Sequence, residues 1–167
     1  VRIFSYNGSA WSQLGSDIDG EAADDRSGWS VSMNAAGDRV AIGAIYNDGT
    51  ANEAGQVRIY EYESGSWTQL GADIDGEAAD DQSGWSVSMN ATGDRVAIGG
   101  ILNNGNGSNA GHVRIFSYNG SAWTQLGFDI DGEAADDQSG RSVSMNAAGD
   151  RVAIGGIINN GNGSNAG

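Results

Sequence analysis

Apolar and polar residues alternate along short segments of this sequence. In residues 29–34, Trp29, Val31 and Met33 alternate with two serines and an asparagine, and this period of two predicts a strand with its apolar face toward a core. The neighbouring segments are rich in β-branched and aromatic residues and are bounded by Gly, Asn and Asp, which is typical of strands joined by turns. The pattern therefore predicts four strands in the first 56 residues, at 1–6, 10–18, 29–34 and 39–46.

The whole pattern then repeats. The tripeptide Val-Arg-Ile begins at Val1, Val57 and Val113, so the period is 56 residues. A period of this size is typical of propellers, solenoids and tandem arrays. A unit of this length buries little surface alone, so we expect neighbouring units to share their cores. The sequence predicts three repeats, at residues 1–56, 57–112 and 113–167, the last of them one residue short.

Four strands joined by short turns are the content of one propeller blade. The fold class predicted is all-β, built from tandem four-stranded antiparallel repeats. Three short motifs resemble the FG-GAP repeat, which forms the β-propeller of integrin α subunits and occurs in large secreted bacterial proteins. They are Ser-Gly-Trp-Ser-Val at 27–31, Ala-Ile-Gly-Ala at 41–44 and Gly-Gln-Val-Arg-Ile-Tyr at 55–60. The family often has an Asp-rich calcium loop where this chain has only residues 34–38, so that site is not carried over.

Three blades do not close a ring by themselves. Either other copies of the chain complete a ring, two chains giving six blades, or the array stays open. We therefore expect copies of the same chain as partners, in a homo-oligomer or a filament.

Composition narrows the classes of partner. The chain has 22 acidic and 8 basic residues, all of the latter Arg, and a net charge of −14. A nucleic-acid partner is not expected, because phosphate contacts need basic patches. The absence of cysteine excludes disulfides and thiol chemistry, and no apolar run is long enough for a membrane helix. From the resemblance to secreted repeats we expect an extracellular or cell-surface protein.

Three acidic loops hold 15 of the 22 acids. In each loop, acids at positions 1, 3, 5 and 9 have the alternation that lets a turning loop direct oxygen ligands toward one calcium ion. The candidate calcium ligands are Asp17, Asp19, Glu21 and Asp25, then Asp73, Asp75, Glu77 and Asp81, then Asp129, Asp131, Glu133 and Asp137. The alternative is a solvated acidic loop that keeps the protein soluble and protects sheet edges.

The sequence offers little for catalysis. His112 is the one histidine, and the same repeat position holds Gln56, so a loop role is expected for it. The carboxylates lie in open, multiply charged loops without an evident apolar pocket to raise a pKa. We therefore predict a protein that is not an enzyme. The leading hypothesis is an extracellular structural or adhesive repeat module that assembles into a surface fibre or longer array. The alternative is a calcium- or carbohydrate-binding, lectin-like propeller that binds a glycan or another cell-surface ligand.

Overall fold

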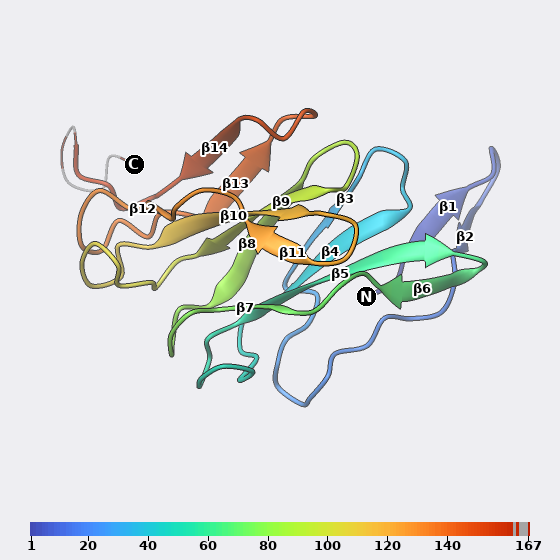
Figure 1. Ribbon diagram of the computed structural model, residues 1–167, viewed down its shortest axis with the longest axis horizontal. Coiled ribbons are helices and arrows are strands. Elements are labelled where there is room, and N and C mark those ends of the chain that lie inside the picture. The colour runs from blue at the N-terminus through green and yellow to red at the C-terminus, as the bar shows by residue number, and fades with distance from the viewer. Residues whose placement is uncertain (162, 164–166) are drawn as a thin grey trace.

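The computed structural model describes residues 1–161, 163 and 167, and all regular structure among them is β (Figure 1). The strands are β1 (Phe4–Tyr6), β2 (Trp11–Gln13), β3 (Ser30–Met33), β4 (Arg39–Ala44), β5 (Gln56–Glu63), β6 (Ser66–Gln69), β7 (Ile74–Asp75), β8 (Ser83–Met89), β9 (Arg95–Gly100), β10 (His112–Tyr118), β11 (Trp123–Gln125), β12 (Ile130–Asp131), β13 (Ser142–Met145) and β14 (Val152–Gly155). The described residues contain no helix long and apolar enough to cross a membrane.

The strands form two five-stranded sheets flanked by two strand pairs. The first large sheet has the order β3-β4-β5-β6 with β7 on β5, and the second has the order β8-β9-β10-β11 with β12 on β10. The pairs β1-β2 and β13-β14 lie at opposite ends of the molecule (Figure 1). Every pairing between named strands is antiparallel. The all-β prediction is confirmed.

The sheets cross the boundaries of the sequence repeat. β4 belongs to the first repeat and β5 to the second, yet they pair along their length, from Arg39 opposite Glu61 to Ala44 opposite Gln56. β9 and β10 pair in the same way. The four strands of one repeat are thus divided between two sheets, so the prediction of one separate four-stranded sheet per repeat is wrong. The chain forms a single domain, because each large sheet needs strands from two repeats.

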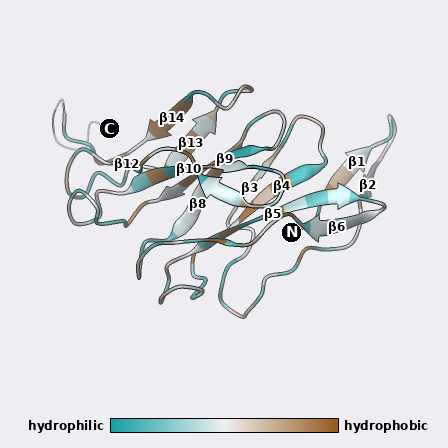
Figure 2. Cartoon of the chain, viewed as in Figure 1, coloured by the Kyte–Doolittle hydropathy of each residue, from teal (hydrophilic) through white to brown (hydrophobic). Residues whose placement is uncertain are grey.

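Apolar clusters lie between successive sheets. The central cluster joins Val57 and Ile59 of the first large sheet to Met89, Val96 and Phe116 of the second. Equivalent clusters join β1-β2 to the first large sheet and join the second large sheet to β13-β14. Figure 2 shows hydrophobic colouring on β14, which borders the last of these clusters. Stacked sheets therefore share their cores, as the length of one repeat predicted.

The alternation predicted for residues 29–34 is modified by the position of the repeat in the stack. Met89 in the second repeat is 7% exposed, as expected for a core-facing residue, whereas its counterpart Met33 is 43% exposed. The difference arises because Met89 packs on a preceding sheet and Met33 has none. The serines on the opposite face make contacts between sheets, since Ser30 Oγ donates a hydrogen bond to the Gly84 carbonyl of the next sheet.

Candidate metal and catalytic site

The acidic loops are held by hydrogen bonds that turn one carboxylate of each loop inward. Asp81 is 1% exposed, and its Oδ2 accepts hydrogen bonds from the Ala78 backbone N–H at 3.1 Å and from Asn103 Nδ2 at 3.0 Å. Asp25 and Asp137 make the same contacts in their own loops. These three residues are the fourth of the predicted calcium ligands in each loop. Their observed partners are the groups that close the loop.

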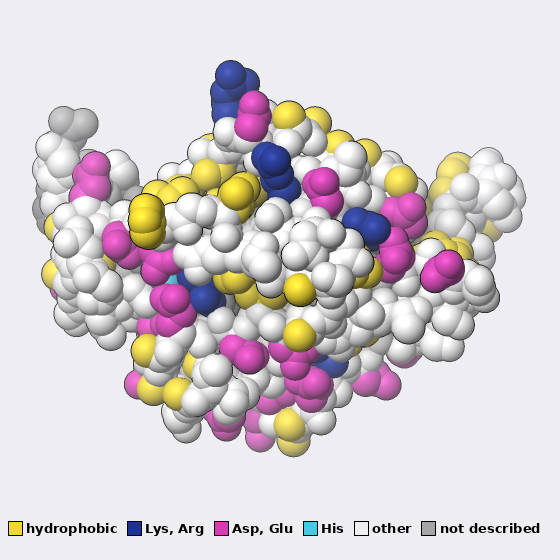
Figure 3. All heavy atoms as spheres, viewed as in Figure 1, with side chains coloured by type: hydrophobic (Ala, Val, Ile, Leu, Met, Phe, Trp, Pro, Cys, Tyr) yellow, Lys and Arg dark blue, Asp and Glu magenta, His cyan; other side chains and the backbone are white. Residues whose placement is uncertain are grey.

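The first predicted ligand of each loop accepts a hydrogen bond from a glutamine of the strand that precedes the loop. Asp73 Oδ1 accepts a hydrogen bond from Gln69 Nε2 at 2.6 Å, and Asp17 and Asp129 have the same bond from Gln13 and Gln125. The side chains of Glu21 and Glu77 lie beside the guanidinium groups of Arg58 and Arg114. Figure 3 shows acidic side chains gathered along the lower edge of the molecule, where these loops lie.

One group among the described residues has the composition and spacing of a metal site. Ligand atoms of Glu77, His112 and Asp129 all lie within 4.8 Å of one another. Glu77 follows β7, His112 begins β10 and Asp129 precedes β12, so the two carboxylates come from two successive acidic loops. The structure thus brings two predicted calcium ligands together, but across a repeat boundary and around a histidine that the calcium prediction did not include.

His112 is directed into this group from the interior. Its side chain is 1% exposed, and its Nδ1 lies 3.6 Å from Asp129 Oδ2. This nitrogen is buried and has no hydrogen-bond partner among the described residues. A buried polar atom without a partner is costly, so the imidazole and the two carboxylates form the candidate metal-binding group.

Arg114 holds the outer carboxylate beside the imidazole. Its Nη2 donates a hydrogen bond to the Asp75 carbonyl at 2.6 Å, and its Nη1 lies 3.5 Å from Glu77 Oε1. Arg58 makes the equivalent contacts with the Asp19 carbonyl and Glu21, where the first acidic loop meets the first large sheet. We call each such meeting of an acidic loop with the following sheet a junction. Each arginine therefore fastens one acidic loop to the following sheet.

The junction of the first acidic loop has the same arginine and glutamate contacts but no histidine. There Gln56 occupies the position of His112, and its Nε2 donates to Glu21 Oε2 at 3.1 Å. Opposite Gln56 the neighbouring strand has Ala44, and opposite His112 it has Gly100. A Cβ on Gly100 would lie 2.9 Å from His112 Nε2, so glycine provides the space for the imidazole. The two junctions thus differ by a matched pair of residues.

Burial sets the ionisation of the group. Burial lowers the pKa of His112 below its ordinary value, and the nearby Arg114 lowers it further, against the carboxylates that raise it. The imidazole is therefore neutral near pH 7, the form that binds a metal. Burial also raises the pKa of Glu77, with a further upward contribution from Asp129 and a downward one from Arg114.

The remaining predicted ligands have other surroundings. Asp75 lies within reach of the Gln56 amide, and burial raises its pKa. Glu133 accepts a hydrogen bond from Asn159 Nδ2. Asp19 in its loop and Asp131 in β12 are exposed. Calcium binding by the complete sets of four carboxylates in each loop stays a prediction.

The signal for His112 was present in the sequence as a covariation between repeats. Ala44 occurs with Gln56, and Gly100 occurs with His112. The sequence interpretation treated the histidine as a loop residue because nothing in the linear order shows that its strand lies beside Gly100 or that two loops meet over it.

Comparisons with known proteins place the fold. No protein-family model matches the sequence, and no curated protein is significantly similar to it. Among solved structures, the fold is similar to that of a "putative 6-phosphogluconolactonase" from Bacteroides uniformis ATCC 8492, with a TM-score of 0.63 and 13% identity. The match covers 95% of this chain and 42% of that protein, so the chain spans less than half of its length.

These findings correct three predictions. The resemblance to FG-GAP repeats is wrong, since no family model matches and the shared fold is that of a protein named as a lactonase. The motifs behind that resemblance are short. The prediction of a non-enzymatic structural or adhesive module, and its lectin-like alternative, are overturned by the same structural match. The prediction that the chain is not an enzyme falls with them.

Proposed function

We propose that this chain is part of a metal-dependent hydrolase that opens a cyclic ester of a sugar, with a divalent cation held by Glu77, His112 and Asp129. The observation that carries the proposal is the buried, unpartnered Nδ1 of His112 placed between two carboxylates. The similarity to a protein named as a lactonase supports the class of reaction. The two five-stranded sheets are then two blades of a propeller, and the site lies where consecutive acidic loops meet.

The donor set favours a particular kind of ion. One imidazole nitrogen with two carboxylates suits Zn²⁺ or Mn²⁺, whereas Ca²⁺ takes oxygen ligands alone. Three protein ligands leave coordination positions for water and substrate, as in catalytic zinc sites. The side chain of Glu77 is 44% exposed, so the group opens to solvent on that side.

The reaction requires one water molecule. Water adds to the ester carbonyl, the bond between the carbonyl carbon and the ring oxygen breaks, and the ring oxygen receives a proton, which leaves an open-chain hydroxy acid. A divalent cation bound by Glu77, His112 and Asp129 would polarise the carbonyl and activate the water, whose proton passes to the ring oxygen.

Charge favours an uncharged substrate. The chain has a net charge of −14, and two of the three residues at the site are acidic. Arg58 and Arg114, the buried arginines of the junctions, are already engaged by glutamates and backbone carbonyls. A neutral sugar lactone is therefore a better fit than a phosphorylated one, because a phosphate group would be repelled by the acidic loops.

Metal binding and hydrolysis can be tested on the 167-residue chain. Isothermal titration with Zn²⁺, Mn²⁺ and Ca²⁺ should show one Zn²⁺ or Mn²⁺ site that H112Q abolishes. The double variant A44G/Q56H rebuilds the histidine junction around Glu21 and should gain a second site. Hydrolysis of δ-gluconolactone should exceed the spontaneous rate with metal, and should return to that rate with EDTA or in H112Q. Equal metal binding by wild type and H112Q would refute the site, and lactone hydrolysis unaffected by EDTA would refute the metal-dependent reaction.

A further inference from the structure

The sequence contains six Asn-Gly pairs, a dipeptide that reacts without an enzyme. In such a pair the glycine nitrogen attacks the side-chain carbonyl carbon of the asparagine, and glycine permits this because it has no side chain in the way. The glycine N–H must lose its proton first, so a pair reacts where that N–H is free. The pairs begin at Asn7, Asn104, Asn106, Asn119, Asn160 and Asn162, the last of which lies outside the described residues.

Hydrogen bonds engage the glycine N–H in three of these pairs. A hydrogen-bonded amide loses its proton only when the bond opens, so its nitrogen is a poor nucleophile in the folded chain. Exposure to solvent does not remove this protection, since Asn104 and Asn106 are both exposed. The three bonds run from Gly105 N to Asn103 Oδ1 at 2.9 Å, from Gly107 N to the Asn104 carbonyl at 3.3 Å and from Gly161 N to Asn159 Oδ1 at 2.9 Å.

The Asn106 side chain is restrained as well as its glycine. Asn106 Nδ2 donates hydrogen bonds to the carbonyls of Gly132 and Glu133 at 2.8 and 3.2 Å. The first repeat has Thr50 at this position, and Thr50 Oγ1 donates to the Gly76 carbonyl at 2.7 Å. The amide of Asn106 is therefore held in a contact between loops that a threonine makes equally well.

The pairs at Asn7 and Asn119 have a free glycine. Each lies in the exposed turn of a hairpin, the first between β1 and β2 and the second between β10 and β11. Gly8 N and Gly120 N donate no hydrogen bond within the part of the chain that the structure describes. A Cβ built on either glycine would meet nothing within 4 Å beyond its chain neighbours, so both turns have open space around the reacting atoms.

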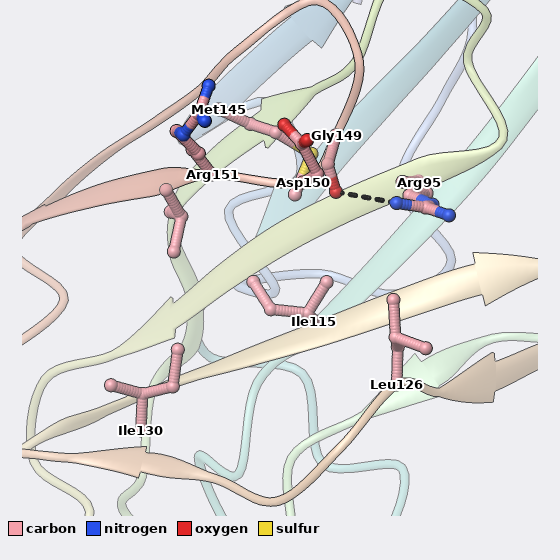
Figure 4. A pocket seen from close by; sticks show the side chains of 9 residues that line it. Arg95, Ile115, Leu126, Ile130, Met145, Gly149, Asp150 and Arg151 are labelled. Atoms are coloured by element: carbon pink, nitrogen blue, oxygen red, sulfur yellow. Dashed lines mark hydrogen bonds between the residues drawn. The ribbon is translucent and has the colours of Figure 1, made fainter.

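The base of the β10-β11 hairpin is packed, in contrast to this open tip. Leu126 N donates a hydrogen bond to the Ile115 carbonyl at 2.7 Å. The side chains of both residues point into a cavity of about 240 Å³ beside β13 and β14 (Figure 4). The hairpin is thus fixed at its base, and the freedom to react is confined to its turn.

Hydrogen-bond donors surround the carbonyl oxygen that the reaction polarises. Asn119 Oδ1 accepts bonds from Ser121 N at 3.0 Å, from Ser121 Oγ at 2.9 Å and from Ala122 N at 3.0 Å. Asn7 Oδ1 accepts the same three bonds from Ser9 and Ala10. Donors directed at an oxygen that gains negative charge stabilise the transition state, as in an oxyanion hole.

We propose that Asn7 and Asn119 deamidate spontaneously in the folded protein, while the fold protects Asn104 and Asn106. At Asn119, the Gly120 N–H loses its proton to solvent, the nitrogen bonds to Asn119 Cγ, and the side-chain nitrogen takes up a proton and leaves as ammonia. One water molecule then opens the resulting succinimide ring at either carbonyl. The products are aspartate and isoaspartate, in which the chain continues through the side-chain carboxyl. Neither hairpin contributes a residue to the proposed metal site, so this inference is independent of the hydrolase.

The two products affect the hairpin differently. An aspartate at 119 accepts the same bonds from Ser121 and Ala122, and more strongly because it is charged, so the turn is retained. Isoaspartate adds a backbone atom between Tyr118 and Trp123, which lie opposite each other with ring centroids 5.2 Å apart. Trp123 packs against the central cluster, so isoaspartate is the product that lowers stability.

Peptide mapping by mass spectrometry tests the proposal on the full chain. At mildly alkaline pH, Asn7 and Asn119 of the folded wild type should convert at least about 5-fold faster than Asn104 and Asn106, because only their glycine N–H groups are free. In concentrated urea the four sites should convert at similar rates, which shows that the fold makes the selection. Equal rates at the four sites in the folded chain would overturn the proposal.

Reciprocal variants test the role of the turn, with the other hairpin as an internal standard. S121A removes one donor to Asn119 and leaves Asn7 unchanged, and S9A does the reverse, so each should slow its own site at least about 3-fold relative to the other. N106T, which introduces the threonine of the first repeat, is the control and should leave both rates unchanged. An unchanged ratio of the two rates in S121A and in S9A would show that the turn does not assist the reaction and overturn the proposal.

Discussion

At the scale of single residues, the facing pair of strand residues differs between the two junctions. Gln56 opposite Ala44 gives a junction closed by an amide, and His112 opposite Gly100 gives one with an unpartnered imidazole nitrogen. Because the surrounding arginine and glutamate contacts are the same, the exchange isolates the role of the histidine. The chain therefore contains its own control for the site.

The close approach of His112 to Gly100 predicts that a larger residue at position 100 destabilises the protein. G100A places a methyl group 2.9 Å from His112 Nε2 and should lower the free energy of unfolding by about 1–3 kcal/mol, as overpacking does in cores. In the H112Q background the cost should fall below about 1 kcal/mol, since Ala44 already faces Gln56 at the other junction. Urea unfolding of the four proteins measures this coupling. Equal costs in both backgrounds would show that the glycine does not serve the imidazole.

Burial of His112 also predicts a dependence of stability on pH. The pKa of His112 is lowered in the folded state, first by burial and then by Arg114. In the unfolded chain the histidine has its ordinary pKa of about 6.5. Below that pH the unfolded chain therefore binds a proton at His112 that the folded chain does not, and the free energy of unfolding decreases. With EDTA present, wild type should lose stability relative to H112Q as the pH falls from about 7.5 to about 5, across that titration. A stability difference that stays constant over this range would contradict the burial of a neutral imidazole.

At the scale of elements, most strands could be predicted from the sequence, but the short strands β7 and β12 and the grouping of strands into sheets could not. The alternation in 29–34 and its copies located β3, β8 and β13, because a period of two is a local property of the sequence, but in β3 the apolar face is the more exposed one. Which strands share a sheet depends on β4 pairing with β5 across the loop between repeats, and on serine and glycine contacts between sheets. Those contacts are between residues 54 positions apart, and no local pattern specifies them.

Close packing between sheets predicts different costs for equivalent glycines. Gly28 and Gly84 have similar positive φ angles, of 95° and 89°, so alanine strains the backbone equally at both. At Gly84 a Cβ would also lie 2.7 Å from the Gln56 carbonyl oxygen, whereas at Gly28 it would meet only a Val1 methyl group at 3.0 Å. G84A should therefore destabilise the protein by at least about 2 kcal/mol more than G28A, measured by thermal unfolding. Equal destabilisation would mean that the sheets are not held at this distance.

At the scale of the whole molecule, the unit that folds is displaced from the unit that repeats in the sequence. Residues 30–131 contain both five-stranded sheets and the central cluster complete. Residues 57–158 have the same length but cut the first sheet between β4 and β5 and so lose Ala41 from that cluster. A boundary chosen from the sequence repeat thus divides a sheet.

This displacement predicts which fragment is the more stable. The 30–131 fragment should unfold cooperatively in urea and at a higher midpoint than the 57–158 fragment, because it keeps every strand of two sheets paired. Circular dichroism at matched concentrations is the measurement. A higher midpoint for 57–158 would contradict the assignment of the sheets.

The candidate site was only half predictable for the same reason. Glu77 and Asp129 were found from the acidic composition of their loops, but they were assigned to two different calcium sites. Their meeting with His112 depends on β7, β10 and β12 lying at one junction, which is a property of the assembled stack. The repeat that made the strands easy to find also obscured the one junction that differs.

Anomalous diffraction from crystals soaked in Zn²⁺ shows whether His112 makes a metal site. We expect an anomalous peak bounded by Glu77, His112 and Asp129, and no peak at the equivalent junction of Glu21, Gln56 and Asp73. Peaks of equal height at both junctions, or none at His112, would contradict the claim that the histidine makes this site.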